Sequence, residues 1–484
     1  MPLARRVAGR VIAAVLCAAA LAAARQMPPP WAGQIDSVFA PWTGRNTPGC
    51  AVGIYQDGRI VYERGFGMAD LEHDVAIAPE TVFYVGSVSK QFTAFAAALA
   101  IKDGRLSPDH SIRKYLPELP AYADAITVRH LIHHTSGLRD YNTLLTIAGR
   151  RGDEAYDNGA VLRITARQKK LNFTPGDEYL YSNTGYTLLA TVVERATGTP
   201  FAAFAEARIF KPLGMDVTHY HVDSGRLVKG RALAYARAAD GAWRLDTPSN
   251  ERAGAGGVYT NVRDLIRWDE NFYHHRVGGE ALIGQVQTPG RLNGGRALTY
   301  AWGLQIGTYR GKPVVEHGGS LGGYRAHLLR FPDQHLSVAA LCNLGSIAPG
   351  ELVRRTADAV AGAAFTEPRP APAGSAGGDG TRGPERQAAA QPPQPMSNYA
   401  GSYYSDEIDA TFTVVARGDG LQLRRDTDTE PAPLLAGPDG AFRARGMSIR
   451  FESGEGGRPA ALIVDAGRVR DIRFARAGGP EPVR

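Results

Sequence analysis

The segment FYVGSVSKQF, residues 83–92, places a serine and a lysine three positions apart at the start of an apolar stretch. The following run, FTAFAAALAI, is apolar nearly all round, which is typical of a buried helix. Ser87 and Lys90 are expected on one face of its first turn. Burial lowers the pKa of a lysine and favours the neutral amine, which can take a proton from a serine hydroxyl. The pattern predicts a serine nucleophile with a lysine base; the alternative is a lysine that extends to solvent.

A second Ser-x-x-Lys pattern, Ser111 to Lys114, serves as an internal comparison. It lies in LSPDHSIRKYLPELP, a polar stretch flanked by prolines, with no apolar helix behind it. Only Ser87 has both a base within one helical turn and a backbone N–H that is free at a helix start, where it can stabilise an oxyanion. The sequence therefore favours the first pattern as the reactive one.

Two further short motifs follow in the chain. Tyr-x-Asn occurs three times, but only Tyr181-Ser182-Asn183 is preceded by a Pro-Gly turn and followed by an apolar helical pattern. His317-Gly318-Gly319 occurs once, at the end of the strand-like run KPVVEH. Each motif alone has little specificity, so their order and flanking sequences carry the interpretation.

The ordered set resembles the serine β-lactamase and penicillin-binding-protein family, in its class C, D-alanyl-D-alanine carboxypeptidase and esterase branch. Supporting stretches are ITVRHLIHHTSGLRDY, FTPGDEYLYSNTGYTLL, IFKPLGMDVT and AGAGGVYTNVRDLIRW, within about residues 35–365. The resemblance implies an α+β fold, in which an antiparallel sheet made by both ends of the domain is flanked by helices and joined to a helical subdomain. The early Asp57-Gly58 hairpin signal, the helical middle and the late strand-like runs agree with this fold.

The resemblance also implies roles for the motif residues. Ser87 is the expected nucleophile, and Lys90 and Tyr181 share the general-base function. Tyr181 is expected to pass the proton to the leaving group. Asn183 is expected to hold Lys90 and a substrate amide by hydrogen bonds. These roles describe an acyl-enzyme mechanism.

The third motif is implied to form the substrate-binding strand. The N–H groups of Ser87 and Ser320 are expected to form the oxyanion hole, and Gly318 and Gly319 leave room for the substrate backbone. No cofactor or metal is expected.

The third motif departs from the Lys-Thr-Gly of β-lactamases, because the chain has His317 where the lysine would stand. The charge and hydroxyl that meet a substrate carboxylate are therefore absent from it. His317 is expected to assist Tyr181, and Arg325 is a candidate for the missing charge. The expected function is an exported serine hydrolase, a peptidase on D-amino-acid or cell-wall-type peptides or an esterase, with β-lactam hydrolysis as an alternative.

The sequence allows three other interpretations. GGSLG, at 318–322, matches the nucleophile elbow of α/β-hydrolases with Ser320 as nucleophile, but a strand-like run follows where a helix is required. His130, His133 and His134 fall on one face of an expected helix, without an acidic or cysteine partner to complete a metal site. A non-catalytic penicillin-fold binding protein would keep the fold and lack part of the chemistry.

The composition and the chain ends indicate several segments. The net charge of +7 is spread along the chain, without the clusters of lysine and arginine that are typical of nucleic-acid-binding proteins. Residues 1–24 are typical of a cleaved signal peptide, so a periplasmic or secreted protein without a membrane span is expected. The catalytic domain is assigned to 25–366, and a Pro/Gly/Ala-rich linker to 367–396. The oligomeric state is left open.

Residues 397–484 alternate apolar and polar positions between Gly-rich turns, which predicts a small antiparallel sandwich or barrel. The alternating pairs include Phe412/Val414, Leu421/Leu423, Met447/Ile449 and Ile472/Phe474. The run YAGSYYSDEIDATFTV resembles the lipocalin-like domains attached to some peptidases of this family. Because the linker cannot transmit packing, the catalytic domain is expected to stay folded when residues 367–484 are deleted.

Cys50 and Cys342 remain after removal of the signal segment. In the family fold the first and last strands are antiparallel neighbours, which places the two cysteines close together. A disulfide and a pair of free buried thiols both remain open.

Overall fold

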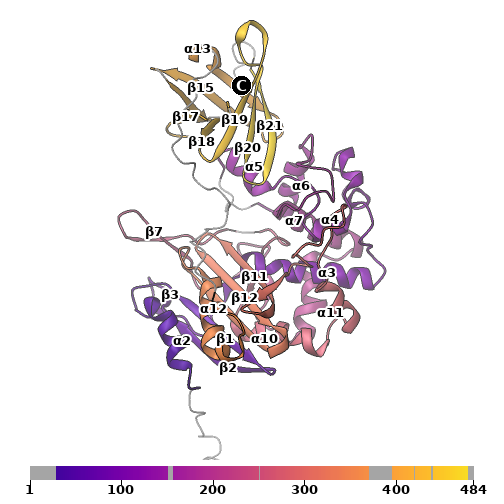
Figure 1. Cartoon of the computed structure of the whole chain (residues 1–484), viewed down its shortest axis with the longest axis vertical. Coiled ribbons are helices and arrows are strands. Elements are labelled where there is room, and N and C mark those ends of the chain that lie inside the picture. Colours follow the sequence, from indigo (N-terminus) through magenta and orange to yellow (C-terminus); the bar gives the residue numbers. More distant parts are fainter. Residues whose placement is uncertain are drawn as a thin grey trace, which may run out of the picture.

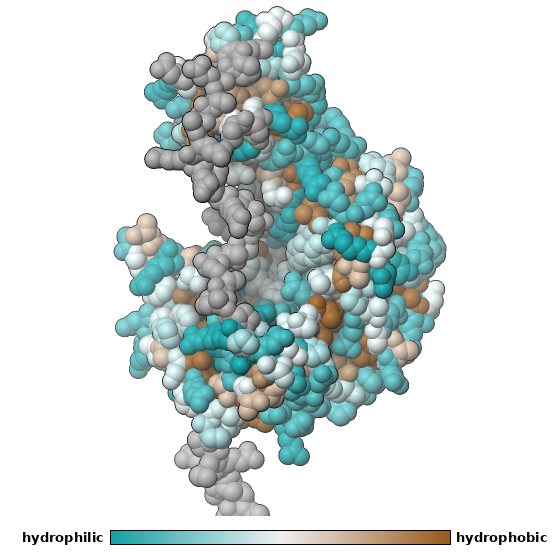
Figure 2. Space-filling model, in the orientation of Figure 1, coloured by the Kyte–Doolittle hydropathy of each residue, from teal (hydrophilic) through white to brown (hydrophobic). Residues whose placement is uncertain are grey.

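The computed structural model describes residues 29–150, 156–249, 251–369, 395–418, 420–437 and 440–477. The expected signal peptide and most of the expected linker lie outside these residues. No helix in the described part of the chain is long and apolar enough to cross a membrane. Figure 2 shows hydrophilic residues over most of one face, with hydrophobic residues in separate small patches.

The catalytic domain is built on a six-stranded antiparallel sheet that both ends of the domain complete (Figure 1). In sheet order the strands are β10 (Gln305–Tyr309), β11 (Lys312–Leu321), β12 (Tyr324–Phe331), β13 (Leu336–Cys342), β1 (Cys50–Gln56) and β2 (Arg59–Phe66). Asp57 and Gly58 have φ angles of 49° and 73° and form the two-residue turn between β1 and β2. The hairpin predicted from Asp57-Gly58 is thus confirmed, as is the α+β fold.

Each face of the sheet has its own apolar core. Along β13, Val338 and Ala340 face α2 (Ala32–Phe39) and α12 (Pro349–Ala361), while Ala339 and Leu341 belong to the larger core with the remaining helices. Successive residues of a strand point to opposite faces, so a strand covered on both sides is apolar throughout. This explains the continuous apolar run at 336–342.

The larger core is mainly helical. It is formed around α3 (Ser89–Lys102), α7 (Asn183–Thr197) and α10 (Val262–His274). The other helices of the domain are α4 (Val128–Ile132), α5 (Tyr141–Ile147), α6 (Asn158–Ala166), α8 (Phe201–Ala205), α9 (Lys211–Leu213) and α11 (Glu280–Val286). Smaller sheets pair β3 (Met68–Asp70) with β4 (Val75–Ala76), β7 (Tyr235–Arg237) with β8 (Trp243–Leu245), and β9 (Val258–Thr260) with both β5 (Phe83–Tyr84) and β6 (His219–Tyr220).

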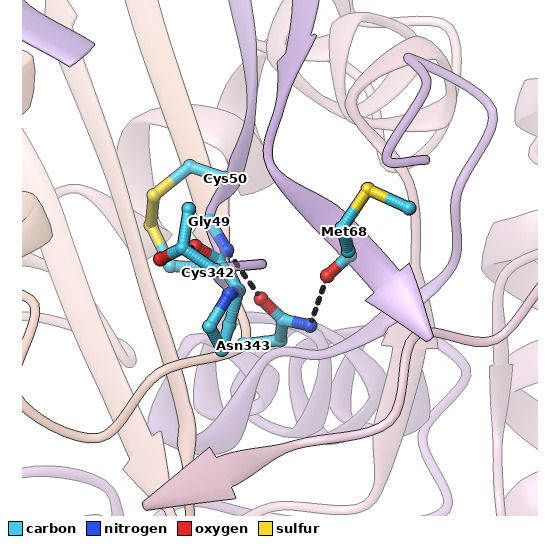
Figure 3. The surroundings of a disulfide bond; sticks show 7 residues. Gly49, Cys50, Met68, Cys342 and Asn343 are labelled. Carbon is cyan, nitrogen blue, oxygen red and sulfur yellow. Dashed lines mark hydrogen bonds between the residues drawn. A yellow bond between two sulfur atoms is a disulfide. The ribbon is translucent and has the colours of Figure 1, made fainter. Parts of the chain in front are cut away.

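Cys50 and Cys342 are directly opposed in the β1–β13 ladder and form a disulfide (Figure 3). Beside them, the Asn343 side chain accepts a hydrogen bond from Gly49 N at 2.8 Å and donates one to Met68 O at 2.9 Å. The cross-link and Asn343 thus join the first and last strands of the domain to β3. The expected proximity of the two cysteines is present, and of the two open alternatives the structure has the disulfide.

The C-terminal domain is a closed antiparallel barrel. Its strands are β14 (Gly401–Ser405), β15 (Ala410–Arg417), β16 (Gly420–Arg425), β17 (Ala432–Ala436), β18 (Phe442–Ala444), β19 (Met447–Glu452), β20 (Ala461–Ala466) and β21 (Val469–Arg476), preceded by α13 (Met396–Tyr399). The alternating residues predicted to be apolar, such as Phe412, Ile449 and Phe474, fill its interior. The small antiparallel β domain is confirmed, as a barrel.

The barrel and the catalytic domain share one apolar core. Tyr141, Leu144, Leu145 and Ile147 of α5, with Val161 of α6, belong to the same buried cluster as the barrel interior. Removing the barrel would expose these side chains to water. This exposure would cost about 25 cal/mol of folding free energy for each Å² of apolar surface. The catalytic domain is therefore expected to lose stability when the barrel is removed, and whether it stays folded alone remains a prediction.

Candidate active site

Ser87 lies in a 3-10 turn, Gly86–Val88, between β5 and α3. The helix starts at Ser89, two residues later than the sequence suggested. Gly86 has a φ of 52°, in the left-handed region, and a Cβ at this position would lie 2.4 Å from Ser320 N. Glycine is therefore required immediately before Ser87, a constraint that the motif did not reveal.

Lys90 is fully buried, and its Nζ lies close to three oxygen atoms. The distances are 3.1 Å to Ser87 Oγ, 2.9 Å to Asn183 Oδ1 and 2.8 Å to Ala255 O. A neutral amine has two N–H donors and one lone pair. The amide and carbonyl oxygens accept the two hydrogens, so the lone pair is available to the Ser87 hydroxyl. This is the arrangement of a general base next to a nucleophile.

The electrostatic surroundings favour that neutral amine. Burial lowers the pKa of Lys90 well below its usual value, and the positive charge of Arg468 lowers it further. The carboxylate of Asp140 acts in the opposite direction. The ring centre of Tyr181 lies 4.7 Å from Nζ.

Tyr181 is positioned immediately before α7. Burial raises the pKa of its phenol above the usual value, and a hydrogen bond with Ser87 partly offsets this. A phenol with a raised pKa keeps its proton at neutral pH. The geometry therefore suits Lys90 as the proton acceptor and Tyr181 as a proton donor and relay.

His134 packs against Tyr181, with ring centres 4.2 Å apart, and its Nδ1 accepts a hydrogen bond from Ser182 N. The expected three-histidine helix face is not formed, because α4 ends at Ile132 and His134 has a φ of 58°. His130 instead caps that helix, accepting a hydrogen bond from Thr127 N. His134 thus supports the Tyr181 ring, which the sequence did not indicate.

Asn183 connects Lys90 to Asp140. Its Oδ1 accepts from Lys90, and its backbone N donates to Asp140 Oδ2 at 2.6 Å. Asp140 also caps α5 by accepting from Thr143 N. The buried carboxylate thereby fixes the start of α7 relative to α5.

The carbonyl of Ala255 is a site component that the sequence analysis missed. Its loop is held by Thr93 Oγ1, which donates to Gly254 O at 2.7 Å, and by the Tyr84 hydroxyl, which accepts from Gly257 N at 3.1 Å. The only sequence signal was the glycine-rich run AGAGG, 253–257, because a backbone acceptor leaves no side-chain signature.

The β11 strand lies directly against the turn that carries Ser87. A Cβ on Gly319 would be 2.0 Å from Val85 O and 2.8 Å from Ser87 N. Ser320 lines the same cavity as Ser87. The structure thus brings the two expected oxyanion donors together, with Gly319 allowing the close approach.

His317 is buried, and above all this burial lowers its pKa to about 3, so it is neutral. Its Nδ1 donates to Gly318 O at 2.6 Å, which leaves Nε2 to accept from the Tyr300 hydroxyl at 3.1 Å. The ring centre of His317 is 6.3 Å from that of Tyr181. Tyr300, which the sequence analysis missed, is the hydrogen-bond partner that the structure gives His317.

Arg325 donates from Nη1 to Gly322 O at 2.6 Å and Tyr324 O at 2.7 Å. Its side chain is thus directed to backbone carbonyls. The cavity beside Ser87, of about 450 Å³, is instead lined by Arg252 and Arg468.

The second Ser-x-x-Lys pattern lies elsewhere, where Ser111 accepts from Arg113 N.

Comparison with known proteins shows the family of the chain. The family model described as Beta-lactamase matches residues 35–363. The chain is 28% identical over 296 residues to a D-aminopeptidase of Gluconobacter oxydans, covering 61% of the chain and 56% of that protein. It is 29% identical over 308 residues to penicillin-binding protein 4* of Bacillus subtilis, covering 60% and 66%. The matches thus span between half and two thirds of the length of these relatives.

Among solved structures, the octameric penicillin-binding protein homologue of Pyrococcus abyssi superposes with a TM-score of 0.61 at 21% identity. The likeness covers 92% of this chain and 99% of that one, which is a likeness of fold. The family match spans more than half of the chain, so the chain belongs to the Beta-lactamase family.

Proposed function

We propose that this protein is an exported peptidase or amidase that cleaves short peptides containing D-amino acids through an acyl-enzyme on Ser87. One observation carries the proposal. A fully buried Lys90 has its Nζ 3.1 Å from Ser87 Oγ, and two other acceptors take up its N–H groups.

The reaction proceeds in two halves. Ser87 Oγ attacks the scissile carbonyl while its proton passes to the Lys90 amine, and the N–H groups of Ser87 and Ser320 stabilise the oxyanion. Tyr181 gives a proton to the leaving amine as the C–N bond breaks, and it is reprotonated from Lys90. Water then attacks the acyl-enzyme by the reverse route, which releases the acid and restores the Ser87 hydroxyl.

The substrate class rests on two supports. The Gluconobacter relative is a D-aminopeptidase, and the third motif has His317 in place of the lysine of β-lactamases. Export is supported by the basic and apolar segment at residues 1–24 and by the Cys50–Cys342 disulfide, which suits an oxidising compartment.

A substrate panel tests the proposal. Mature protein and its Ser87→Ala variant are assayed on D-amino-acid amides, N-acetyl-D-Ala-D-Ala, p-nitrophenyl esters and nitrocefin. We expect Ser87-dependent hydrolysis of the D-configured amides or peptides, with little on their L-isomers. Turnover of esters alone would indicate an esterase, turnover of nitrocefin above the peptides would indicate a β-lactamase, and no turnover would indicate a binding protein.

A further inference from the structure

The turn between β20 and β21 extends from the barrel to the catalytic domain (Figure 1). Its two residues are Gly467, with a φ of 46°, and Arg468. Asn172 of the catalytic domain donates to Arg468 O at 3.0 Å and accepts from Arg470 N at 2.9 Å. The backbone of the hairpin is thus fixed on both sides of Arg468.

Additional contacts hold the same hairpin. Arg139 donates to the carbonyls of Arg470 and Asp471 and forms a buried ion pair with Glu407 of the barrel. Arg470 forms a two-pronged ion pair with Glu178, at 2.9 and 3.1 Å. The Asn172 and Arg139 contacts hold the backbone that carries Arg468, whereas the Arg470–Glu178 pair is exposed to solvent.

Arg468 lines the cavity that contains Ser87, Tyr181 and Asn183. Its guanidinium carbon lies 5.6 Å from the Tyr181 ring centre, and its Nη1 is 3.6 Å from Asp140 Oδ2. That oxygen already accepts from Asn183 N at 2.6 Å. Arg468 Nε is buried and has no hydrogen-bond partner within the described part of the chain. The long ion pair leaves hydrogen-bonding capacity on the guanidinium of Arg468, whose side chain is 24% exposed.

The charge of the cavity lining has one sign. Among the described residues that line it are two arginines, Arg252 and Arg468, and no aspartate or glutamate. Asp140 is fully buried, is not among the lining residues, and accepts a hydrogen bond from Asn183 N. A guanidinium recognises carboxylates by paired, charge-assisted hydrogen bonds. The charged side chains that line the cavity therefore favour an anionic group.

We infer that Arg468 of the barrel is a substrate-binding residue of the active site, and that it binds a carboxylate of the peptide substrate. The inference rests on the proposed function and names the substrate class, namely D-residue peptides that carry a carboxylate near the scissile bond. Arg468 would then supply the positive charge that the sequence analysis expected from Arg325. The complete site then requires both domains.

The test compares matched substrate pairs on the full-length mature protein. One pair, N-acetyl-D-Ala-D-Ala and its C-terminal amide, differs by a carboxylate on the leaving-group side. The other, the N-succinyl and N-acetyl forms of D-Ala p-nitroanilide, differs by one on the acyl side. Arg468→Gln should lower kcat/KM for one carboxylate-bearing member about 10- to 100-fold more than for its neutral partner, mainly through KM, as a hydrogen bond to a charged group is lost.

Arg470→Gln is the matched control, because Arg470 lies on the same hairpin and pairs with Glu178 on the surface. It should leave the selectivity within each pair unchanged. Arg468→Lys should restore part of the preference for the carboxylate-bearing member, since lysine returns the positive charge without the two parallel N–H donors of a guanidinium. Thermal melts of each variant identify any loss of folding.

Equal losses on charged and neutral members with Arg468→Gln would overturn the inference and leave Arg468 as a domain contact. Unchanged kinetics with both pairs would overturn it too. Failure of the proposed function gives a different result, because wild-type protein would then turn over neither member of either pair.

Discussion

The surroundings of Lys90 favour its neutral amine, which is the form that can accept the proton of Ser87. Two acceptors, Asn183 Oδ1 and Ala255 O, use the two hydrogens of a neutral amine, and burial disfavours the ammonium. Lys90→Ala should lower kcat by a factor on the order of 10²–10⁴, the usual size of a general-base contribution, while the fold is retained. Lys114→Ala, in the second Ser-x-x-Lys pattern, should leave kcat unchanged. Steady-state kinetics with circular dichroism measure both, and full activity of Lys90→Ala would exclude Lys90 as the base.

The charges around Lys90 make a prediction about pH. Only the neutral amine accepts the Ser87 proton, so kcat/KM should rise with pH as Lys90 is deprotonated. Arg468 lowers the pKa of Lys90 and Asp140 raises it. Hence Arg468→Gln should move the acid limb of the profile to higher pH, and Asp140→Asn should move it to lower pH. A neutral ester substrate separates this effect from carboxylate binding, and shifts of the same sign in both variants would be inconsistent with the assigned charges.

The sequence located those site residues whose side chains form part of an ordered motif. Ser87, Lys90, Tyr181 and Asn183 were predicted and are brought together. The Ala255 carbonyl was missed because any residue has one. Arg468 was missed for another reason, since its proximity to Ser87 arises only when the barrel docks on the catalytic domain.

At the scale of elements, the turn before α3 depends on one glycine. Gly86 has a φ of 52°, and a Cβ added there would lie 2.4 Å from Ser320 N. Gly104, beyond the end of α3, has a φ of 70°, and a Cβ added there would have no neighbour within 4 Å. Gly104→Ala should cost about 1–2 kcal/mol of stability, from the left-handed conformation alone, and keep activity. Gly86→Ala should also displace the turn from β11 and lower kcat/KM by more than tenfold. Chemical denaturation and kinetics on both variants measure this, and equal activity of the two would show that the close contact has no catalytic importance.

The elements themselves were predictable where the pattern is local. The Asp57-Gly58 hairpin and the alternating barrel residues follow from turn chemistry and side-chain period. The start of α3 was misplaced because Ser87 lies in a 3-10 turn, which β5 and β11 hold from outside the helix. Tertiary contacts of this kind leave no local signal.

At the scale of the whole molecule, a buried ion pair joins the two domains. Arg139 and Glu407 are 0% and 4% exposed, with Nη1 2.5 Å from Oε2. Glu407→Ala should destabilise the protein by about 3–5 kcal/mol, because it leaves a buried guanidinium without its counter-charge. Glu178→Ala, which breaks the exposed pair with Arg470, should cost about 0–1 kcal/mol. Urea unfolding of the full chain measures both changes, and equal small effects would indicate that the interface does not rely on this pair.

The docking of the barrel has a consequence for function. Its apolar core continues into α5 and α6, and its β20–β21 turn brings Arg468 beside Tyr181. A sequence pattern cannot show such an arrangement, because the residues involved are separated by nearly 300 positions and a linker. The inferred binding of a substrate carboxylate by Arg468 and the burial of α5 thus both depend on the C-terminal domain.

The most direct test is to locate the adduct formed with a fluorophosphonate. Intact and peptide mass spectrometry of the labelled protein should find one adduct, on Ser87. Ser87→Ala should abolish labelling, because the amine of Lys90 lies 3.1 Å from Ser87 Oγ. Ser320→Ala and Ser111→Ala should keep it, because neither of these hydroxyls is hydrogen-bonded to Lys90 in the described part of the chain. An adduct on Ser320, or labelling that persists in Ser87→Ala, would contradict the assignment of Ser87 as the nucleophile.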